Sequence, residues 1–74
     1  MKLHDAIVTV LLDQPENLAT IDLIANEINL KNLYMRKDKQ PLQSFQVRLR
    51  AKFCKGAYHH LFDWIEPNLV RLKK

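Results

Sequence analysis

The sequence predicts a mainly α-helical fold that ends in a small β-hairpin, and three observations support this class. Apolar residues recur with a helical period in three segments of the first 54 residues. Capping residues or prolines stand where these segments begin or end. After Gly56 the apolar pattern changes to the alternation of a strand, and a turn sequence interrupts it.

The first helical segment begins near Leu3. Four apolar residues and one polar residue in the last turn have the spacing of a single helical face: Leu3, Ile7, Val10, Leu11 and Gln14. Pro15 ends this helix, because the residue before a proline is disfavoured in the α region. We therefore expect the helix to run to about Gln14, and the following Leu18 and Ala19 to be able to form a short strand.

The second helix has a clear start signal at Thr20, whose hydroxyl is suited to an N-cap. Asp22 follows in the first turn, where a negative charge interacts favourably with the helix dipole. Four residues make the apolar face: Ile21, Ile24, Ala25 and Ile28.

The third helix is predicted from Pro41, a residue suited to the first helical position, to about Lys52 or Cys54, with Gly56 just past its end. At about 100° per residue its core side consists of Leu42, Phe45, Leu49 and Phe53. The opposite, outward side consists of Gln43, Ser44, Val47, Arg50 and Ala51, with Arg48 and Lys52 at the two margins.

The hairpin is predicted from the alternation around Phe62 and Trp64 and from the return segment 69–72, with the turn residues Glu66-Pro67-Asn68 between them. A lone hairpin is marginally stable in water, so it needs the three helices to pack on, and Trp64 is expected to lie in the core or to anchor the hairpin. The order of elements predicts a winged helix-turn-helix, three helices plus a β-wing, in a single domain of residues 1–74.

Charge is distributed unevenly along the 74 residues. Residues 1–30 carry a net charge of −4, and residues 31–74 carry +8. One face of such a small domain would attract a polyanion. The basic half contains the exposed loop 34–40, the third helix and the hairpin, so this asymmetry favours nucleic acid as the partner over a merely solvated polar face.

Composition argues against several other classes. Cys54 is the only cysteine, so no internal disulfide can form, and we expect a reducing, cytoplasmic setting. The apolar run 6–12 is too short for a membrane span, and no small-residue cleavage site follows it. Cys54, His59 and His60 lack the paired spacing of a zinc site. We expect no cofactor and no enzymatic activity, because no phosphate loop, catalytic triad or paired carboxylates are present.

Residues 3–72 resemble the HARE-type winged-helix domain, which occurs in some restriction enzymes, in chromatin regulators and in the delta subunit of bacterial RNA polymerase. The matching residues are Ala6, Val10 and Leu11 in the first helix, 20-TIDLIANEI-28 in the second, Pro41, Ser44, Phe45 and Leu49 in the third, and Phe62 and Leu72 in the wing. Gln40, Leu23 and the turn 66–68 depart from the family pattern. The resemblance implies a DNA-binding or DNA-associated module without catalytic activity.

Double-stranded DNA is therefore the expected partner of a transcription or restriction regulator. The third helix would enter the major groove, and the basic loop and wing would hold the phosphate backbone. The predicted contacts are Arg36, Lys37, Lys39, Gln43, Ser44, Arg48, Arg50, Lys52, Arg71, Lys73 and Lys74. Ser44 could instead be partly buried.

Two apolar residues of the outward side leave an alternative open. Val47 and Ala51 could meet thymine methyl groups in the groove, or they could form a docking patch for a second helix or subunit. In the second case the domain would be a protein-interaction adaptor of a larger complex, such as an RNA polymerase or a restriction system.

Overall fold

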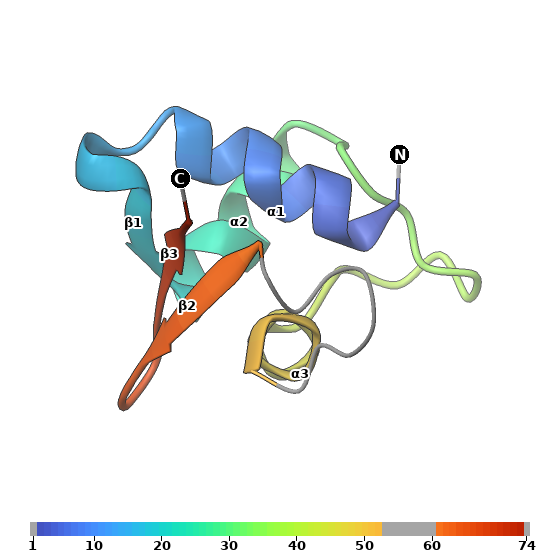
Figure 1. Ribbon diagram of the computed structural model, residues 1–74. Coiled ribbons are helices and arrows are strands. Elements are labelled where there is room, and N and C mark those ends of the chain that lie inside the picture. The colour runs from blue at the N-terminus through green and yellow to red at the C-terminus, as the bar shows by residue number, and fades with distance from the viewer. Residues whose placement is uncertain (1, 53–60, 74) are drawn as a thin grey trace.

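Three helices and a three-stranded antiparallel sheet make up the computed structural model shown in Figure 1, which describes residues 2–52 and 61–73. The elements follow the order α1 (Leu3–Leu12), a 3-10 turn η1 (Pro15–Asn17), β1 (Leu18–Thr20), α2 (Ile21–Leu30), α3 (Ser44–Lys52), β2 (Phe62–Ile65) and β3 (Leu69–Leu72). This helix-rich α/β arrangement is compatible with the predicted winged helix.

The first two helices form where local signals predict them. α1 ends at Leu12, two residues before the predicted end, and Pro15 begins the 3-10 turn. Thr20 caps α2, because its hydroxyl oxygen accepts a hydrogen bond of 3.1 Å from the backbone N–H of Leu23. The predicted end of α1 is thus confirmed to within two residues, and the predicted start of α2 is confirmed.

The sheet has the order β1-β3-β2, so the hairpin strand β3 lies in the centre. Phe62 pairs with Leu72 across the hairpin, and Ala19 of β1 pairs with Val70. The predicted hairpin and the predicted third strand at residues 18–19 are both confirmed. The pairing of β1 with β3 joins segments some fifty residues apart in the sequence.

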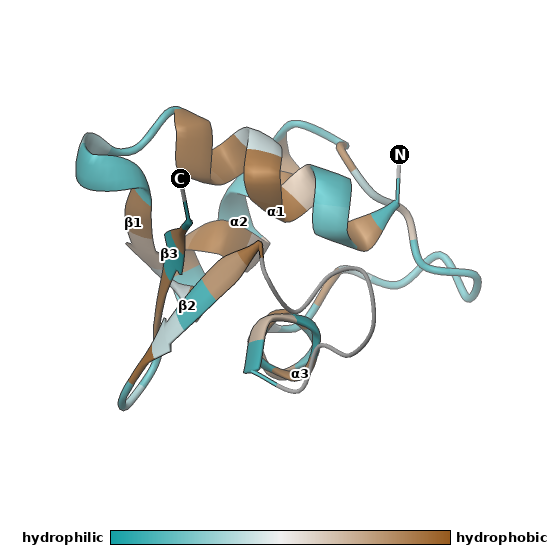
Figure 2. Cartoon of the chain, viewed as in Figure 1, coloured by the Kyte–Doolittle hydropathy of each residue, from teal (hydrophilic) through white to brown (hydrophobic). Residues whose placement is uncertain are grey.

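One core lies between the helices and one face of the sheet. α1 packs against β3 and α3 against β2, as Figure 1 shows, and Val70 and Phe62 are buried on this face. Because side chains alternate along a strand, their neighbours Arg71 and Asp63 point to the opposite face. Figure 2 shows that hydrophobic residues predominate in α1, whereas the loop between α2 and α3 is mainly hydrophilic.

α3 differs from the sequence prediction in its start and in its orientation. It begins at Ser44 instead of Pro41, and residues 41–43 belong to the preceding loop. Val47 and Ala51 are the buried residues of the helix, at 0% and 6% exposure. Phe45 and Leu49, predicted in the core, are 57% and 50% exposed. The predicted sides were therefore wrong for these four residues, whereas Leu42 is buried as predicted. Phe53 lies outside the described residues.

Candidate nucleic-acid interface

The start of α3 is held by residues of the preceding loop and of α2. The side-chain amide of Asn29 in α2 donates to the carbonyl oxygen of Leu42 at 3.0 Å and accepts from the N–H of Leu42 at 2.9 Å. Leu42 is thereby a core residue, 4% exposed, although it lies outside the helix. The helix then starts two residues later, and Val47 and Ala51 lie on its inner side.

Gln43 occupies the N-cap position of α3, with an exposed side chain. Its backbone N–H donates to the side-chain oxygen of Gln46 at 3.1 Å, which is one half of a capping box. Ser44 is half-buried, as the sequence left open. Of the polar residues predicted to enter a groove at this end, Gln43 is the more accessible.

The outward face of α3 carries an apolar ridge that the sequence interpretation missed. Phe45 and Leu49 lie four residues apart on a helix and therefore on the same face. We call these two residues the α3 ridge. Val47 and Ala51 are buried, so the predicted docking patch or groove contact at those two positions is wrong. Apolar residues alternate at positions 45, 47, 49 and 51, so either 45 and 49 or 47 and 51 could face the core. No local sequence signal distinguished these two orientations.

Two cations on one flank of the ridge join α3 to the hairpin. Arg48 Cζ lies 6.0 Å and Lys52 Nζ 5.5 Å from the centroid of the Trp64 ring. Lys52 also forms an ion pair with Glu66 in the hairpin turn, at 2.9 Å. Trp64 packs against the core, which confirms its predicted anchoring role. These contacts hold the hairpin against the side of α3.

The carboxyl group of Glu66 is part of the same contact. The hydrogen bond from Lys52, and next the Trp64 indole, hold the pKa of Glu66 below its ordinary value. The indole nitrogen of Trp64 is buried and forms no hydrogen bond with any described residue. Lys52 is thus partly neutralised by Glu66, whereas Arg48 forms no ion pair within the described part of the chain.

Arg50 lies on the other flank of the ridge. At about 100° per residue it is roughly 200° around the helix from Arg48. It borders a shallow hollow of about 210 Å³ together with Lys2, Leu3, His4 and Tyr34. Lys2, which belongs to the acidic half of the sequence, therefore lies near this flank, a position that only the tertiary structure reveals.

The loop before α3 contains three predicted phosphate contacts with different surroundings. Arg36 is engaged within the loop, because its guanidinium donates to the Asp38 carboxylate at 2.9 Å and to the Pro41 carbonyl oxygen at 3.4 Å. Lys37 and Lys39 are exposed and form no ion pair with any described residue. Arg36 therefore stabilises the loop, whereas the two lysines are exposed to a partner in solution.

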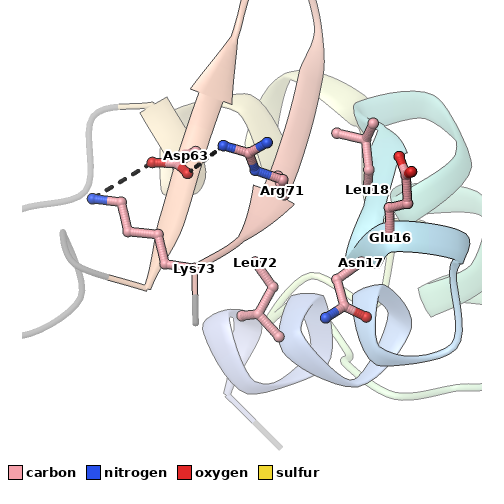
Figure 3. A pocket seen from close by; sticks show the side chains of 7 residues that line it. All are labelled: Glu16, Asn17, Leu18, Asp63, Arg71, Leu72 and Lys73. Carbon is pink, nitrogen blue, oxygen red and sulfur yellow. Dashed lines mark hydrogen bonds and ion pairs between the residues drawn. The ribbon is translucent and has the colours of Figure 1, made fainter.

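The hairpin cations lie elsewhere. Figure 3 shows Arg71 and Lys73 on either side of Asp63, whose carboxylate is 3.0 Å from the Arg71 guanidinium and 3.6 Å from Lys73 Nζ. They line an open hollow of about 620 Å³ with Glu16, Asn17, Leu18 and Leu72. Because Asp63 and Arg71 occupy the sheet face opposite the helices, the structure does not bring these two cations to α3. Lys74 lies outside the described residues.

The predicted contact set thus divides into two groups. Cations without an ion pair among the described residues lie on α3 and its preceding loop: Lys37, Lys39, Arg48 and Arg50. Cations paired with carboxylates are found in the loop turn, at the hairpin edge of α3 and on the far face of the sheet: Arg36, Lys52, Arg71 and Lys73. Within the predicted contact set, the described cations without an ion pair thus belong to α3 and the loop before it.

Within residues 2–52 and 61–73, no three His, Cys, Asp or Glu side chains come together as a metal site. The sequence's candidate ligands Cys54, His59 and His60 fall outside this part of the chain. In the same residues, no helix combines the length and apolar character that crossing a bilayer requires.

Comparisons of the chain with protein-family models, with curated proteins and with solved structures find no match. The resemblance to HARE-type domains stays a prediction from the sequence.

Proposed function

We propose that this chain is a winged-helix module that binds double-stranded DNA, with α3 facing the major groove. The observation that carries the proposal is a group of four cations on α3 and its loop that form no ion pair with any residue in the described ranges 2–52 and 61–73. α3 itself contains no acidic residue. Phosphate contacts supply most of the affinity of such complexes, and cations already paired with carboxylates contribute less to it.

In this arrangement the two flanks of α3 have separate roles. Arg48, on the hairpin side, and Arg50, on the α1 side, would each reach toward one phosphate strand bordering the groove. Lys37 and Lys39 would extend the contact along the backbone, and the exposed Gln43 would face base edges at the start of the helix. The resemblance to HARE-type domains supports the same role, as the DNA-holding part of a transcription or restriction regulator.

Titration of the protein with a short duplex at several salt concentrations tests the proposal. With about four phosphates neutralised, log affinity should fall against log salt with a slope of about −4. Absence of binding even at low salt would contradict the proposal, and a slope near zero would argue against phosphate contacts.

A second candidate function, docking of a protein partner, is favoured by the half-exposed Phe45 and Leu49. The two functions respond differently to charge. Replacing Arg48 and Arg50 together by Ala should abolish DNA binding, whereas docking through an apolar ridge should survive this change and be weakened by Leu49→Asp. Sedimentation of the protein with each partner distinguishes them.

A further inference from the structure

We infer that the α3 ridge recognises thymine methyl groups, so that the module prefers A·T-containing major grooves. This inference rests on the proposed DNA binding and adds its base-reading residues. The ridge is formed by Phe45 and Leu49, which are 57% and 50% exposed on the side of α3 opposite the buried Val47 and Ala51. In a helix that faces the groove, these two side chains would be the closest to the base pairs.

The chemistry of the ridge fits one feature of the groove floor. A phenyl ring and an isobutyl group can neither donate nor accept hydrogen bonds, so they cannot read the polar edges of guanine, cytosine or adenine. The C5-methyl of thymine is the apolar group that the major groove of unmodified DNA presents, and apolar side chains contact it. Gln43, exposed at the start of α3, has the amide that pairs with adenine, the partner base of thymine.

The dimensions of α3 agree with this role. An α-helix with its side chains is about 10–12 Å across, which fits a major groove about 12 Å wide. Phe45 and Leu49 are separated by about 6 Å along the helix axis, which corresponds to roughly two base-pair steps. The ridge can therefore meet the methyl groups of two thymines about two base-pair steps apart while Arg48 and Arg50 remain at its flanks.

Charge and area disfavour the other occupants of this ridge. A second copy of the chain would bring the same cations, Arg48 and Arg50, against each other across the contact. A protein partner in a stable complex buries about 800 Å² on each side, and two half-exposed side chains supply a small part of that area. Double-stranded DNA, a polyanion with thymine methyl groups in its major groove, is complementary to both the cations and the ridge.

The test compares an alternating A·T duplex with the same duplex in which every thymine is replaced by uracil, which removes the methyl groups and keeps base pairing. The protein should bind the thymine duplex more tightly, by about fourfold for each methyl group contacted. The variants Phe45→Ala and Leu49→Ala should each reduce this preference, and the double variant should remove it. Leu30→Ala, at an exposed leucine of α2, is the matched control and should keep the preference.

The outcomes separate this inference from the proposed function. Salt-dependent binding with equal affinity for both duplexes would leave DNA binding in place and overturn the methyl contact, leaving the ridge to a protein partner. A thymine preference that persists in the double variant would also overturn it. Failure to bind either duplex at low salt would remove the proposed function and this inference with it. Circular-dichroism melting of each variant verifies that the fold is retained.

Discussion

The side-chain amide of Asn29 satisfies both backbone polar groups of Leu42, thirteen residues later in the chain, through hydrogen bonds of 3.0 and 2.9 Å. An amide side chain has both a donor and an acceptor, so it can imitate the pairing of a neighbouring strand. This contact holds Leu42 in the core just before α3 begins. A residue of α2 therefore anchors the chain at the start of the proposed interface.

Asn29→Ala should destabilise the protein by about 2–3 kcal/mol, because it leaves the N–H and the carbonyl of a buried leucine without partners. Asn26→Ala, at an exposed asparagine of the same helix, is the control and should leave stability nearly unchanged. Urea unfolding followed by the fluorescence of the single tryptophan, Trp64, measures both. Equal stability of the two variants would show that the contact contributes nothing.

The orientation of α3 can be checked by truncating one residue from each apolar stripe. Val47→Ala should cost about 2–3 kcal/mol, since Val47 is fully buried and its methyl groups leave a cavity. Leu49→Ala removes more atoms but should cost less than about 1 kcal/mol, because the side chain is half-exposed. The opposite ranking, from the same urea unfolding, would support the orientation predicted from sequence.

Local signals were sufficient to predict most elements of the fold. The Thr20 cap, the proline that ends α1 and the alternation in the hairpin each lie within a few residues of the structure they determine, and each is confirmed. Helical spacing misled the prediction for α3: Phe45 and Leu49 were assigned to the core because they share one arc with Leu42 and Phe53, but Leu42 lies before the helix begins. The contact that holds Leu42 before the helix comes from Asn29, which is distant in sequence, and it has no apolar signature.

The predicted interface was limited by the same kind of distant contact. From the sequence, Arg71 and Lys73 were predicted to contact phosphates. The hairpin register places Asp63 opposite Arg71, however, and its carboxylate forms ion pairs with both cations. Likewise Lys2, in the acidic half, comes near Arg50 through tertiary packing. Positive charge can be counted from sequence, whereas its availability depends on which carboxylates the fold brings beside it.

The ion pair between Lys52 and Glu66 predicts a defined dependence of stability on pH. The pKa of Glu66 is lower in the folded protein, so the folded state binds fewer protons than the unfolded chain at acid pH. The stabilisation is fully present above the ordinary carboxyl pKa of about 4.3 and is lost as pH falls through the lowered folded value. Glu66→Gln should therefore lower the melting temperature slightly at pH 7, and the difference from wild type should vanish at strongly acid pH.

A double-mutant cycle assigns this effect to the pair. In a Lys52→Met background, Glu66→Gln should lose most of its pH-dependent effect, because the principal cause of the lowered pKa is absent. An unchanged effect in that background would assign the pH dependence to another neighbour, with the Trp64 indole the first to examine.

The division between unpaired and paired cations gives the most direct prediction for function. Lys37→Gln with Lys39→Gln should weaken duplex binding and reduce the magnitude of the salt slope by about 2, because each removes one phosphate contact. Arg71→Gln with Lys73→Gln removes the same formal charge from the far face of the sheet, where Asp63 already neutralises part of it. This second pair should change the slope by much less than 1. Since the two variants have equal net charge, a uniform electrostatic attraction would affect both equally, and equal slopes would contradict an interface centred on α3.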